Sequence, residues 1–583
     1  MLYFNKEMIA KIIKTKKWLF LIFLLAVGFI LTHRFFFMSG DFNTHDGVHF
    51  IRLYNLEKIF KEGQFPPRWL PDLGKGYGYP FFNFYPPLAY FAGLVFRLLG
   101  ASFTFANKLS FGLAGLIGLG GMFFLAKNFF GFWGGAGAAL FWLFLPYRAV
   151  DLYVRGSLAE YWGLNLLPVV FYLAKRLFDR QSVGRLLLFI ISLFLLLIAH
   201  NAVALIGIIW LIGFIIYLFF TDKGWSLKKI KKGIFFKLSF FWALGLAAFF
   251  VIPAIWEKSS TQIADMTNDY YAYYNHFPSL AQLFISRFWG YGGSNFGLND
   301  EMSFQIGHLH WISVLLALPI LAWNLVVKKL SLFKQKKNCL MALFFGGSFF
   351  LFAFLAHQRS LFIWQRVGFL AFLQFPWRLL IFIGFSASIL AGYLMSFLKK
   401  KFAFLIFIIL FLILGGLSFN YFQPKEIIDR NDHDYLSSPL WEYQQREFIT
   451  DYLPKTVREI PKDYYSWPLV VNQEAKINLE RDQADKIIFT ASSPDTKQTA
   501  LIKRFYFPGW EAVINQEPVD IDINNNGFMI LTLPKGEAEV ELAFKNTPIR
   551  QAANAISLTT WFLFLIGALA KKYWQKKINL SKK

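Results

Sequence analysis

The first candidate for chemistry is a carboxylate, an imidazole and a guanidinium spaced three residues apart. Asp46, His49 and Arg52 occupy positions i, i+3 and i+6, so on a helix they share one broad face. Such a trio is suited to binding an anion while a proton is taken from an acceptor hydroxyl. The alternative is an interfacial helix with a solvated polar face, capped at its start by Thr44 or Asp46.

A second candidate lies in a short polar stretch, residues 148–160, between two apolar runs. Glu160 begins the second of these runs, and a carboxylate near bilayer depth is costly unless it has a partner or a function. We therefore expect Glu160 to be functional. The alternative is that Glu160 pairs with Arg155 or Arg148 and stabilises the start of its helix.

Two histidine pairs with metal-compatible spacing raise the question of a divalent ion. Carboxylates of the two stretches above are candidate oxygen ligands. The candidate metal ligands are Asp46, His49, Glu160 and His308. No single motif supplies a complete ligand set, so a requirement for Mg²⁺ or Mn²⁺ stays open.

Arginines beside aromatic residues are candidates for holding a phosphate. Arg378 follows Trp377 directly, and Arg359 and Arg366 precede them. The guanidinium fork suits a lipid-linked phosphate, whereas anchoring at a membrane interface is the alternative.

Arg68 lies in a run rich in glycine, proline and aromatic residues, 65–87. Glycine and proline at this density cannot continue a helix, so we expect a rigid loop on the membrane interface that lines a cavity or merely anchors there. The glycines lack the Lys-Ser/Thr pair of a phosphate loop. A nucleotide site is therefore unsupported.

The composition excludes a soluble globular protein as the carrier of these residues. Of 583 residues, 56% are hydrophobic and only 16% are charged, against about 25% charged in soluble domains. The net charge of +24 comes from Lys and Arg grouped between apolar runs. This pattern is typical of the positive-inside rule rather than of nucleic-acid binding.

We predict a polytopic α-helical membrane protein of about twelve spans, with both termini in the cytoplasm. The predicted spans are 18–38, 104–126, 132–150, 161–178, 185–199, 202–221, 235–255, 310–327, 339–356, 376–398, 402–420 and 553–570. The first outer loop, 39–103, holds an apolar run, Pro86 to Leu99, that is shorter than the roughly 20 residues of a span and is expected to be interfacial. The second outer loop is 148–160, and a larger one is 256–309.

The sequence predicts three parts: a transmembrane module at 1–420, an extracytoplasmic β-rich domain at 421–550, and a last span with a basic cytoplasmic tail at 551–583. The β-rich prediction rests on a β-branched run at 486–490, alternation at 538–542, and the turn Asn526-Gly527.

These motifs together resemble the GT-C class of membrane glycosyltransferases. The chain is more closely similar to the bacterial membrane-protein family labelled "6-pyruvoyl-tetrahydropterin synthase-related", and to YfhO-like proteins. The motifs that carry the resemblance are Asp46-x-x-His49-x-x-Arg52, Phe65-Pro66-Pro67-Arg68-Trp69, Gly76-Tyr77-Gly78-Tyr79-Pro80, Tyr85-Pro86-Pro87, Arg155-Gly156-Ser157-Leu158-Ala159-Glu160, Phe375-Pro376-Trp377-Arg378 and Tyr506-Phe507-Pro508-Gly509-Trp510. The pterin label carries no weight, because nothing in the sequence suggests a pterin enzyme.

The resemblance implies an enzyme that moves a sugar from a polyprenyl-phosphate donor to a glycan, glycolipid or envelope-polymer acceptor on the extracytoplasmic face. Asp46 would be the catalytic base and Glu160 a second acidic group. Arg378, Arg155 or Arg68 would neutralise the phosphate leaving group. The substrate-binding candidates as a whole are His49, Arg52, Arg68, Arg155, Arg378, Trp377 and His308. The Asp-x-Asp motif that many such enzymes show is absent from the first outer loop.

Two other functions stay open. A lipid or glycan transporter or flippase should carry ionisable residues near mid-span, whereas here they gather at the outer ends of the predicted spans. A non-catalytic envelope-assembly scaffold would act through its β-rich domain. The predicted outer stretches contain no Asn-x-Ser/Thr site, which favours the plasma membrane of a prokaryote.

Overall fold

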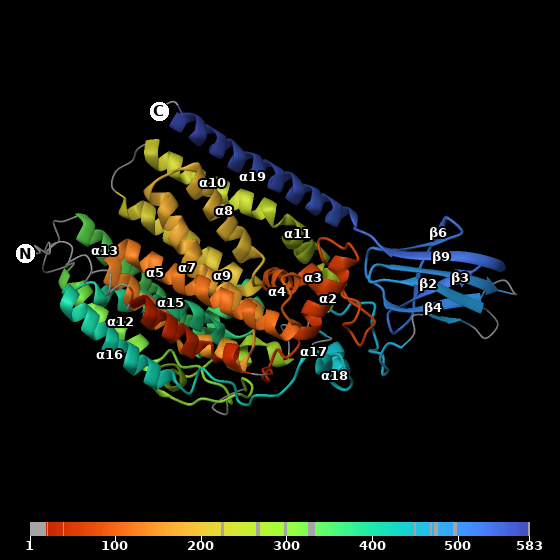
Figure 1. Cartoon of the computed structure of the whole chain (residues 1–583), viewed down its shortest axis with the longest axis horizontal. Coiled ribbons are helices and arrows are strands. Elements are labelled where there is room, and N and C mark those ends of the chain that lie inside the picture. The colour runs from red at the N-terminus through yellow and green to blue at the C-terminus, as the bar shows by residue number, and fades with distance from the viewer. Residues whose placement is uncertain are drawn as a thin grey trace, which may run out of the picture.

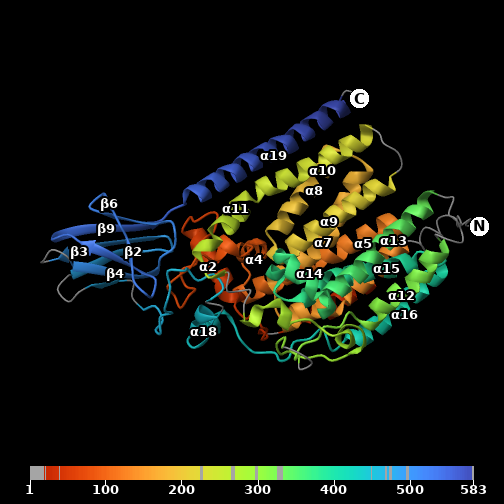
Figure 2. The same cartoon turned by 180° about the vertical axis from the view of Figure 1, so that it is seen from behind.

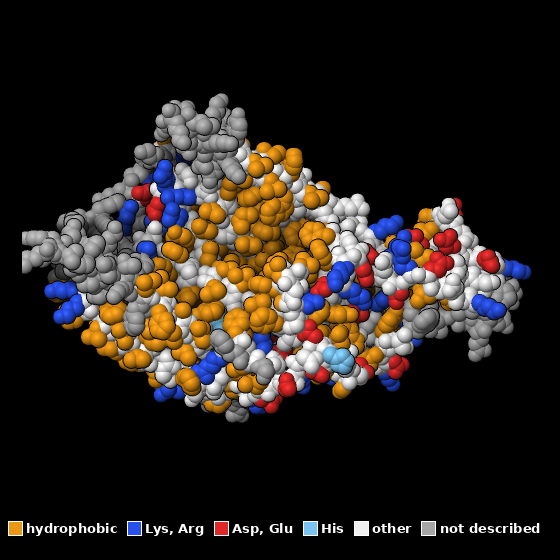
Figure 3. All heavy atoms as spheres, in the orientation of Figure 1, with side chains coloured by type: hydrophobic (Ala, Val, Ile, Leu, Met, Phe, Trp, Pro, Cys, Tyr) orange, Lys and Arg blue, Asp and Glu red, His pale blue; other side chains and the backbone are white. Residues whose placement is uncertain are grey.

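The computed structural model describes residues 19, 21–38, 40–222, 227–263, 269–295, 300–324, 333–447, 450–466, 469–471, 476–493 and 498–580. Within these residues a bundle of helices occupies one part of the molecule and a β-sandwich stands at one end (Figures 1 and 2). Hydrophobic side chains cover much of the visible bundle surface, whereas the sandwich carries charges of both signs (Figure 3). This distribution is that of a membrane-embedded bundle with a solvent-exposed domain.

The bundle is built from apolar helices. They are Leu21–Thr32, α5 (Phe103–Leu143), α7 (Leu158–Asp179), α8 (Val183–Leu197), α9 (Asn201–Thr221), α10 (Leu227–Leu246), α11 (Ala248–Trp256), α12 (His308–Ala322), α13 (Phe333–Ala356), α15 (Leu380–Met395), α16 (Lys400–Ser418) and α19 (Pro548–Leu580). Among the described residues, six helices are long and apolar enough to cross a membrane, or seven if α10 and α11 form one span. The count of twelve spans stays a prediction.

The α5 range contains a reversal of the chain. Gly131 has φ 75° and ψ −172°, which is not helical. A Cβ on Gly135 would lie 2.7 Å from the carbonyl oxygen of Phe123, although twelve residues of straight helix would separate these positions by about 18 Å. The two segments predicted on either side of Gly131 are therefore separate helices that fold back on each other.

The single span predicted at 235–255 is bent. Its two halves, α10 and α11, are inclined by 74°. The hydroxyl of Ser557, on α19, lies 3.1 and 3.0 Å from the carbonyl oxygens of Gly245 and Leu246, and it accepts a hydrogen bond of 2.9 Å from the amide of Phe249. Ser557 thus satisfies backbone groups at the bend, as membrane helices require.

Short helices of the predicted first outer loop lie between the bundle and the sandwich (Figure 1). They are α2 (His49–Lys61), α3 (Phe81–Phe84) and α4 (Leu88–Leu98). At 1.5 Å per residue α4 is about 16 Å long, which is too short for a hydrocarbon core of about 30 Å.

The glycine- and proline-rich loop after α2 packs on the sandwich through Trp69 and Tyr77. Trp69 is fully buried and its ring centroid lies 5.6 Å from that of Trp510. Tyr77 is buried too, with its ring centroid 4.7 Å from that of Phe528. Gly78 adopts a φ of 74° directly against Trp69, where a Cβ would lie 2.5 Å from the indole nitrogen. This loop therefore docks the sandwich, and its position relative to the membrane interface stays a prediction.

The sandwich has two antiparallel sheets, with strand orders β1-β4-β8-β7 and β2-β3-β9-β5-β6. Its strands are β1 (Leu469–Val471), β2 (Lys476–Asp482), β3 (Lys486–Ser493), β4 (Gln498–Phe505), β5 (Trp510–Ile514), β6 (Glu517–Val519), β7 (Asp522–Ile523), β8 (Phe528–Leu533) and β9 (Gly536–Phe544). The alternation seen in the sequence places Phe489 of β3 opposite Val540 of β9, both buried. The C-terminal β-rich region is confirmed.

Residues 421–447, which lie within the predicted β-rich part, instead hold two short helices, α17 (Asp432–Tyr435) and α18 (Leu440–Arg446). The carboxylate of Asp432 accepts hydrogen bonds from the amides of Phe103 and Thr104 at the start of α5. The side chain of Gln444 accepts one from the amide of Ile51. This segment therefore holds the first outer loop against the bundle.

Candidate active site

Two loops that are far apart in the sequence are joined backbone to backbone. The amide of His45 donates to the carbonyl of Val154 at 3.1 Å, and the amide of Asp46 donates to that of Arg155 at 2.8 Å. Gly156 follows with a φ of 64°, and a Cβ there would lie 2.2 Å from Oγ1 of Thr44. The contact requires glycine and places the Asp46 loop beside the residues that lead to Glu160.

Asp46 lies in the turn before α2 rather than on its helical face. The helix begins at His49, and its N-cap, Val48, makes no side-chain capping bond. Neither Thr44 nor Asp46 is therefore the cap that the sequence suggested. Asp46 is nevertheless within electrostatic reach of both Arg52 and Arg155.

Both ring nitrogens of His49 are occupied. Nε2 lies 2.5 Å from the carbonyl oxygen of Gly156, which can only accept, so Nδ1 accepts from the hydroxyl of Tyr90 at 2.9 Å. Burial, reinforced by the Arg52 cation, lowers the pKa of His49 to about 4. The ring is therefore neutral near pH 7, and its hydrogen bond to Gly156 connects α2 to the loop at 148–160.

Glu160 is fully buried, and several polar groups converge on its carboxylate. Oε1 accepts a hydrogen bond of 2.6 Å from the hydroxyl of Tyr147. Oε2 lies 2.7 Å from a guanidinium nitrogen of Arg155, 3.1 Å from Nε of Arg378, and 3.9 Å from Nε2 of His200. One carboxylate thus holds two guanidinium groups in place.

Further contacts orient each arginine. Arg155 also pairs with Asp151 at 2.8 Å, and its guanidinium carbon lies 4.9 Å from the centroid of the Trp377 ring. Arg378 donates to the backbone carbonyl of Leu373 at 2.7 Å and to the side chain of Gln374 at 3.0 Å. Both cations are therefore fixed in direction before any ligand arrives.

Arg52 and Asp451 extend the cluster toward the sandwich side. The guanidinium carbon of Arg52 lies 4.7 Å from the ring centroid of Phe81 and 5.0 Å from that of Tyr85. Tyr452 packs on the same two rings, at 5.8 and 6.4 Å. This packing brings Asp451, the residue before Tyr452, within electrostatic reach of Arg52 and Asp46.

Arg68 and His308, two of the predicted substrate-binding residues, lie elsewhere. Arg68 donates to the side chains of Asn83 and Asn554, both at 3.0 Å, in a separate buried cluster with Glu257. His308 bonds the carbonyl of Ile285 at 3.1 Å and lines a different cavity. Neither makes a contact with Glu160 among the described residues.

The candidate metal ligands do not lie close enough together to bind one ion. The part of the chain that the structure describes contains no group of three or more His, Cys, Asp or Glu side chains placed to hold a metal ion. Both ring nitrogens of His49 form hydrogen bonds with protein groups, and His308 lines another cavity. The set Asp46, His49, Glu160 and His308 therefore does not form a metal site in this arrangement.

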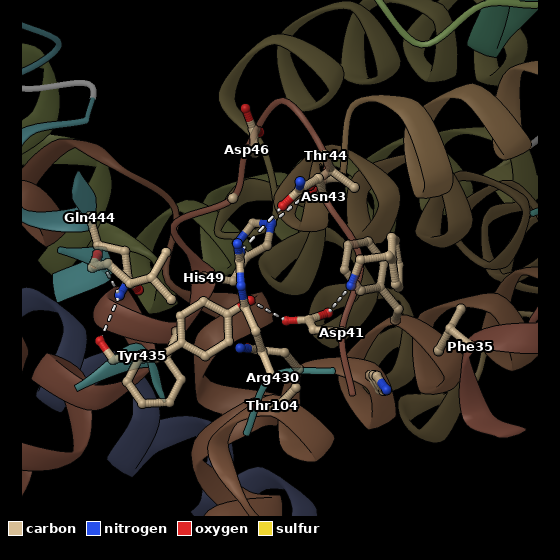
Figure 4. Close-up of a pocket in the computed structure, with 18 of the residues that line it drawn as sticks. Phe35, Asp41, Asn43, Thr44, Asp46, His49, Thr104, Arg430, Tyr435 and Gln444 are labelled. Carbon is tan, nitrogen blue, oxygen red and sulfur yellow. Dashed lines mark hydrogen bonds between the residues drawn. The ribbon is translucent and has the colours of Figure 1, made fainter. Parts of the chain in front are cut away.

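A cavity of about 330 Å³ lies beside the Asp46 loop, and Asp46 and His49 are among the residues that line it. Asp41, Arg430 and Tyr435 line it, and Asp41 accepts a hydrogen bond of 2.8 Å from the Tyr435 hydroxyl. Figure 4 shows the carboxylate of Asp46 pointing away from Asp41 and Tyr435. The cavity therefore adjoins the loop that carries Asp46.

Residues 82–296 match the model of the "6-pyruvoyl-tetrahydropterin synthase related domain; membrane protein" family. The predicted resemblance to this family is confirmed. The match includes Glu160 and Arg155 but begins after Asp46 and Arg52. Over these residues the chain is similar to that membrane-protein family.

An uncharacterized protein of Lactococcus lactis subsp. cremoris (strain MG1363) is 24% identical over 345 residues, which cover 53% of this chain and 55% of that protein. The chain therefore spans about half the length of this relative.

Two solved structures are similar to the chain at low identity. The oligosaccharyltransferase of Archaeoglobus fulgidus in the apo form is 12% identical, with 77% of this chain and 61% of that one covered and a TM-score of 0.43. ArnT from Cupriavidus metallidurans bound to undecaprenyl phosphate is 14% identical, with 68% and 63% covered and a TM-score of 0.35.

Proposed function

We propose that the chain is a glycosyltransferase that moves a sugar from a polyprenyl-phosphate donor to an acceptor hydroxyl on the extracytoplasmic face of a prokaryotic plasma membrane. The observation that carries this proposal is the convergence of Arg155 and Arg378 on buried Glu160, directly beside the Asp46 loop. Two preoriented guanidinium groups are suited to a phosphate that gains charge as it leaves.

The reaction that fits this arrangement is a single displacement. The acceptor oxygen forms a bond to the anomeric carbon, and the bond from that carbon to the phosphate oxygen breaks with its electron pair on the phosphate. Arg155 and Arg378 stabilise the released phosphate, and the carboxylate of Asp46 takes the proton of the acceptor hydroxyl. Glu160 keeps both arginines aligned.

The test is transfer of sugar by the purified full-length protein in lipid, from a panel of radiolabelled polyprenyl-phosphate sugars, with and without Mg²⁺ or Mn²⁺. Asp46→Asn should lower kcat by about 10² to 10⁴, the usual contribution of a general base. Asp429→Asn, an exposed carboxylate on a neighbouring segment, serves as the matched control and should retain activity.

Absence of donor turnover in the wild type would overturn the transferase assignment and favour a flippase or a scaffold. Wild-type turnover that survives in Asp46→Asn would keep the transferase but remove Asp46 as its base.

A further inference from the structure

The cavity of about 330 Å³ is assembled from three segments that are tied to one another. Its described lining comes mainly from the stretch 41–50, the start of α5, and the segment 430–444 (Figure 4). Asp41 exchanges two backbone hydrogen bonds, each of 2.8 Å, with Ile428. Lys108, on α5, donates to two backbone carbonyls just before the first stretch. The walls are therefore fixed before any ligand enters, as is usual for small-molecule sites.

The charged groups of the lining balance one another. The described lining holds two carboxylates, Asp41 and Asp46, and two cations, Lys108 and Arg430. Lys108 already donates to backbone carbonyls, and both cations lie within electrostatic reach of Asp41. The cavity therefore offers no surplus of positive charge to an anionic ligand.

Three polar groups of the lining keep hydrogen-bonding capacity for a ligand. The buried Oδ1 of Asn107 has no hydrogen-bond partner among the described residues. Each carboxylate oxygen of Asp41 accepts one bond, from the amide of the next residue at 2.9 Å and from the hydroxyl of Tyr435 at 2.8 Å, and can accept another. Arg430 carries five donors, more than its contacts with Asn43 and Tyr435 use. Donors and acceptors in one cavity suit hydroxyl groups, which both donate and accept.

Aromatic rings supply the apolar part of the lining. Phe50 stacks on Tyr435 with ring centroids 4.8 Å apart, which joins α2 to α17, and Phe42 lies against Tyr153 with centroids 5.7 Å apart. Phe42, Phe50 and Tyr435 all line the cavity. A sugar ring has C–H faces that pack on aromatic rings and hydroxyls at its rim that need polar partners, so a lining of this mixed kind suits a saccharide. The cavity is near the lower end of the usual range for ligand sites, about 300 to 1,000 Å³, which suits a small ligand rather than a lipid chain.

We propose that this cavity binds the acceptor, and that the acceptor is a neutral saccharide. Its hydroxyls are held by Asp41, Asn107 and Arg430, and its ring packs on the aromatic residues of the lining. The saccharide class follows from the lining alone, whereas the role as acceptor rests on the proposed function.

The Asp46 loop forms part of the cavity wall. Asp46 and Gly156 are among the described lining, and Gly156 follows Arg155, one of the two arginines proposed to bind the phosphate. The carboxylate of Asp46 points away from Asp41 and Tyr435 (Figure 4). These two residues therefore bind the part of the saccharide that is remote from the reacting hydroxyl.

The experiment is titration of the full-length protein in lipid nanodiscs, followed by saturation-transfer NMR. The probes are the methyl glycosides of glucose, galactose, mannose and N-acetylglucosamine, with methyl glucuronide as the anionic counterpart. At least one neutral glycoside should bind, and more tightly than the glucuronide. Asn107→Leu and Arg430→Met should each weaken that binding by about tenfold, because each removes hydrogen bonds to the sugar. Arg446→Met, which changes an exposed arginine at the end of α18 outside the lining, is the matched control and should bind as the wild type does.

Asn107→Leu keeps the test decisive if Arg430→Met does not fold, because it removes an oxygen that has no partner in the described residues. Wild-type affinity for the glycoside in the cavity variants would overturn the site. A wild type that binds no neutral glycoside would overturn the saccharide class, and so would a glucuronide that binds more tightly and is released by Arg430→Met.

Titration without a donor separates this inference from the proposed function. A protein that binds the glycoside but transfers no sugar would overturn the transferase and leave the saccharide site in place. Where transfer is measured, the two cavity variants should raise KM for the acceptor by about tenfold with kcat nearly unchanged, because neither side chain takes the proton. A loss confined to kcat would overturn the acceptor role.

Discussion

Glu160 is the residue on which the candidate site depends most. Its carboxylate is fully buried and faces Arg155 and Arg378. Removal of one member of a buried ion pair leaves uncompensated charge and typically costs about 3 to 5 kcal/mol. Glu160→Gln should therefore lower the thermal unfolding temperature clearly, as well as abolish transfer.

The matched control is Glu541→Gln, which removes the partner of Lys486 in an exposed pair on the sandwich. Exposed pairs contribute about 0 to 1 kcal/mol, so this variant should unfold close to the wild type when both are followed by tryptophan fluorescence in detergent. Equal losses in the two variants would contradict the buried cluster at Glu160.

Asp451 gives a second prediction at the same scale, for stability rather than rate. Its pKa is about 7 in the folded protein against about 3.9 in an unfolded chain. The folded state therefore binds this proton more tightly, and stability should fall as pH rises from about 4 to 7. Asp451→Asn should flatten that fall, seen as a smaller difference between unfolding temperatures at pH 5 and pH 8, whereas the exposed Asp429→Asn should not. An unchanged slope in Asp451→Asn would argue against the shifted pKa.

Sequence reasoning singled out Glu160 because a carboxylate at the start of an apolar run is costly without a purpose, Asp46 by its spacing to two further polar residues, and Arg155 and Arg378 as groups suited to a phosphate. The structure brings these four near one another. Arg68 and His308 have the same residue types in similar settings, but their tertiary partners place them apart. No sequence motif pointed to Asp451 as a site residue, because its surroundings are assembled from α2, α3 and the segment after α18. The roles of all these residues stay predictions until the variants are measured.

At the scale of elements, glycines decide how closely α5 and α7 approach. A Cβ on Gly118 would lie 2.0 Å from Oδ1 and 2.8 Å from Cβ of Asn165, which is fully buried on α7. Gly118→Ala should therefore push the helices apart and cost about 1 to 3 kcal/mol. Gly120→Ala, where nothing lies within 4 Å, should be neutral or slightly stabilising because alanine favours helix. Thermal unfolding of the two variants in detergent checks this; comparable stability of both would contradict the α5 and α7 contact.

Helix type was easier to predict from the sequence than helix geometry. Long apolar runs indicated the bundle, and alternation indicated β3 and β9. The reversal at Gly131 was predicted only as a gap between two runs, and the bend between α10 and α11 was not predicted, because it depends on Ser557, some 300 residues further along the chain. The docking of residues 65–80 on the sandwich was missed for the same reason: aromatic residues look alike whether they meet lipid or protein.

For the whole molecule, a buried clamp joins the sandwich to the bundle. Arg550 at the start of α19 pairs with Glu257 at 2.9 Å and donates to the carbonyl of Pro508 at 2.8 Å. Arg550→Met should release this junction, seen as faster hydrogen exchange at 505–510 and faster proteolysis beside the sandwich. Lys545→Met, which breaks the exposed pair with Glu511, should change neither. Equal protection in Arg550→Met and the wild type would show that the clamp does not hold the sandwich.

Because of this clamp, the length of α19 also determines the position of the sandwich. This helix has 33 residues and is about 50 Å long, of which the apolar part is Pro548–Ala570. α19 is one of the candidate membrane spans, and Arg550 fixes its start to the sandwich. We therefore expect its length to set how high the sandwich and the neighbouring loops stand above the lipid headgroups. Activity should then depend on the acyl-chain length of the surrounding lipids, since a thinner or thicker bilayer tilts the helix and moves the reacting groups relative to the plane in which a lipid-linked phosphate must lie.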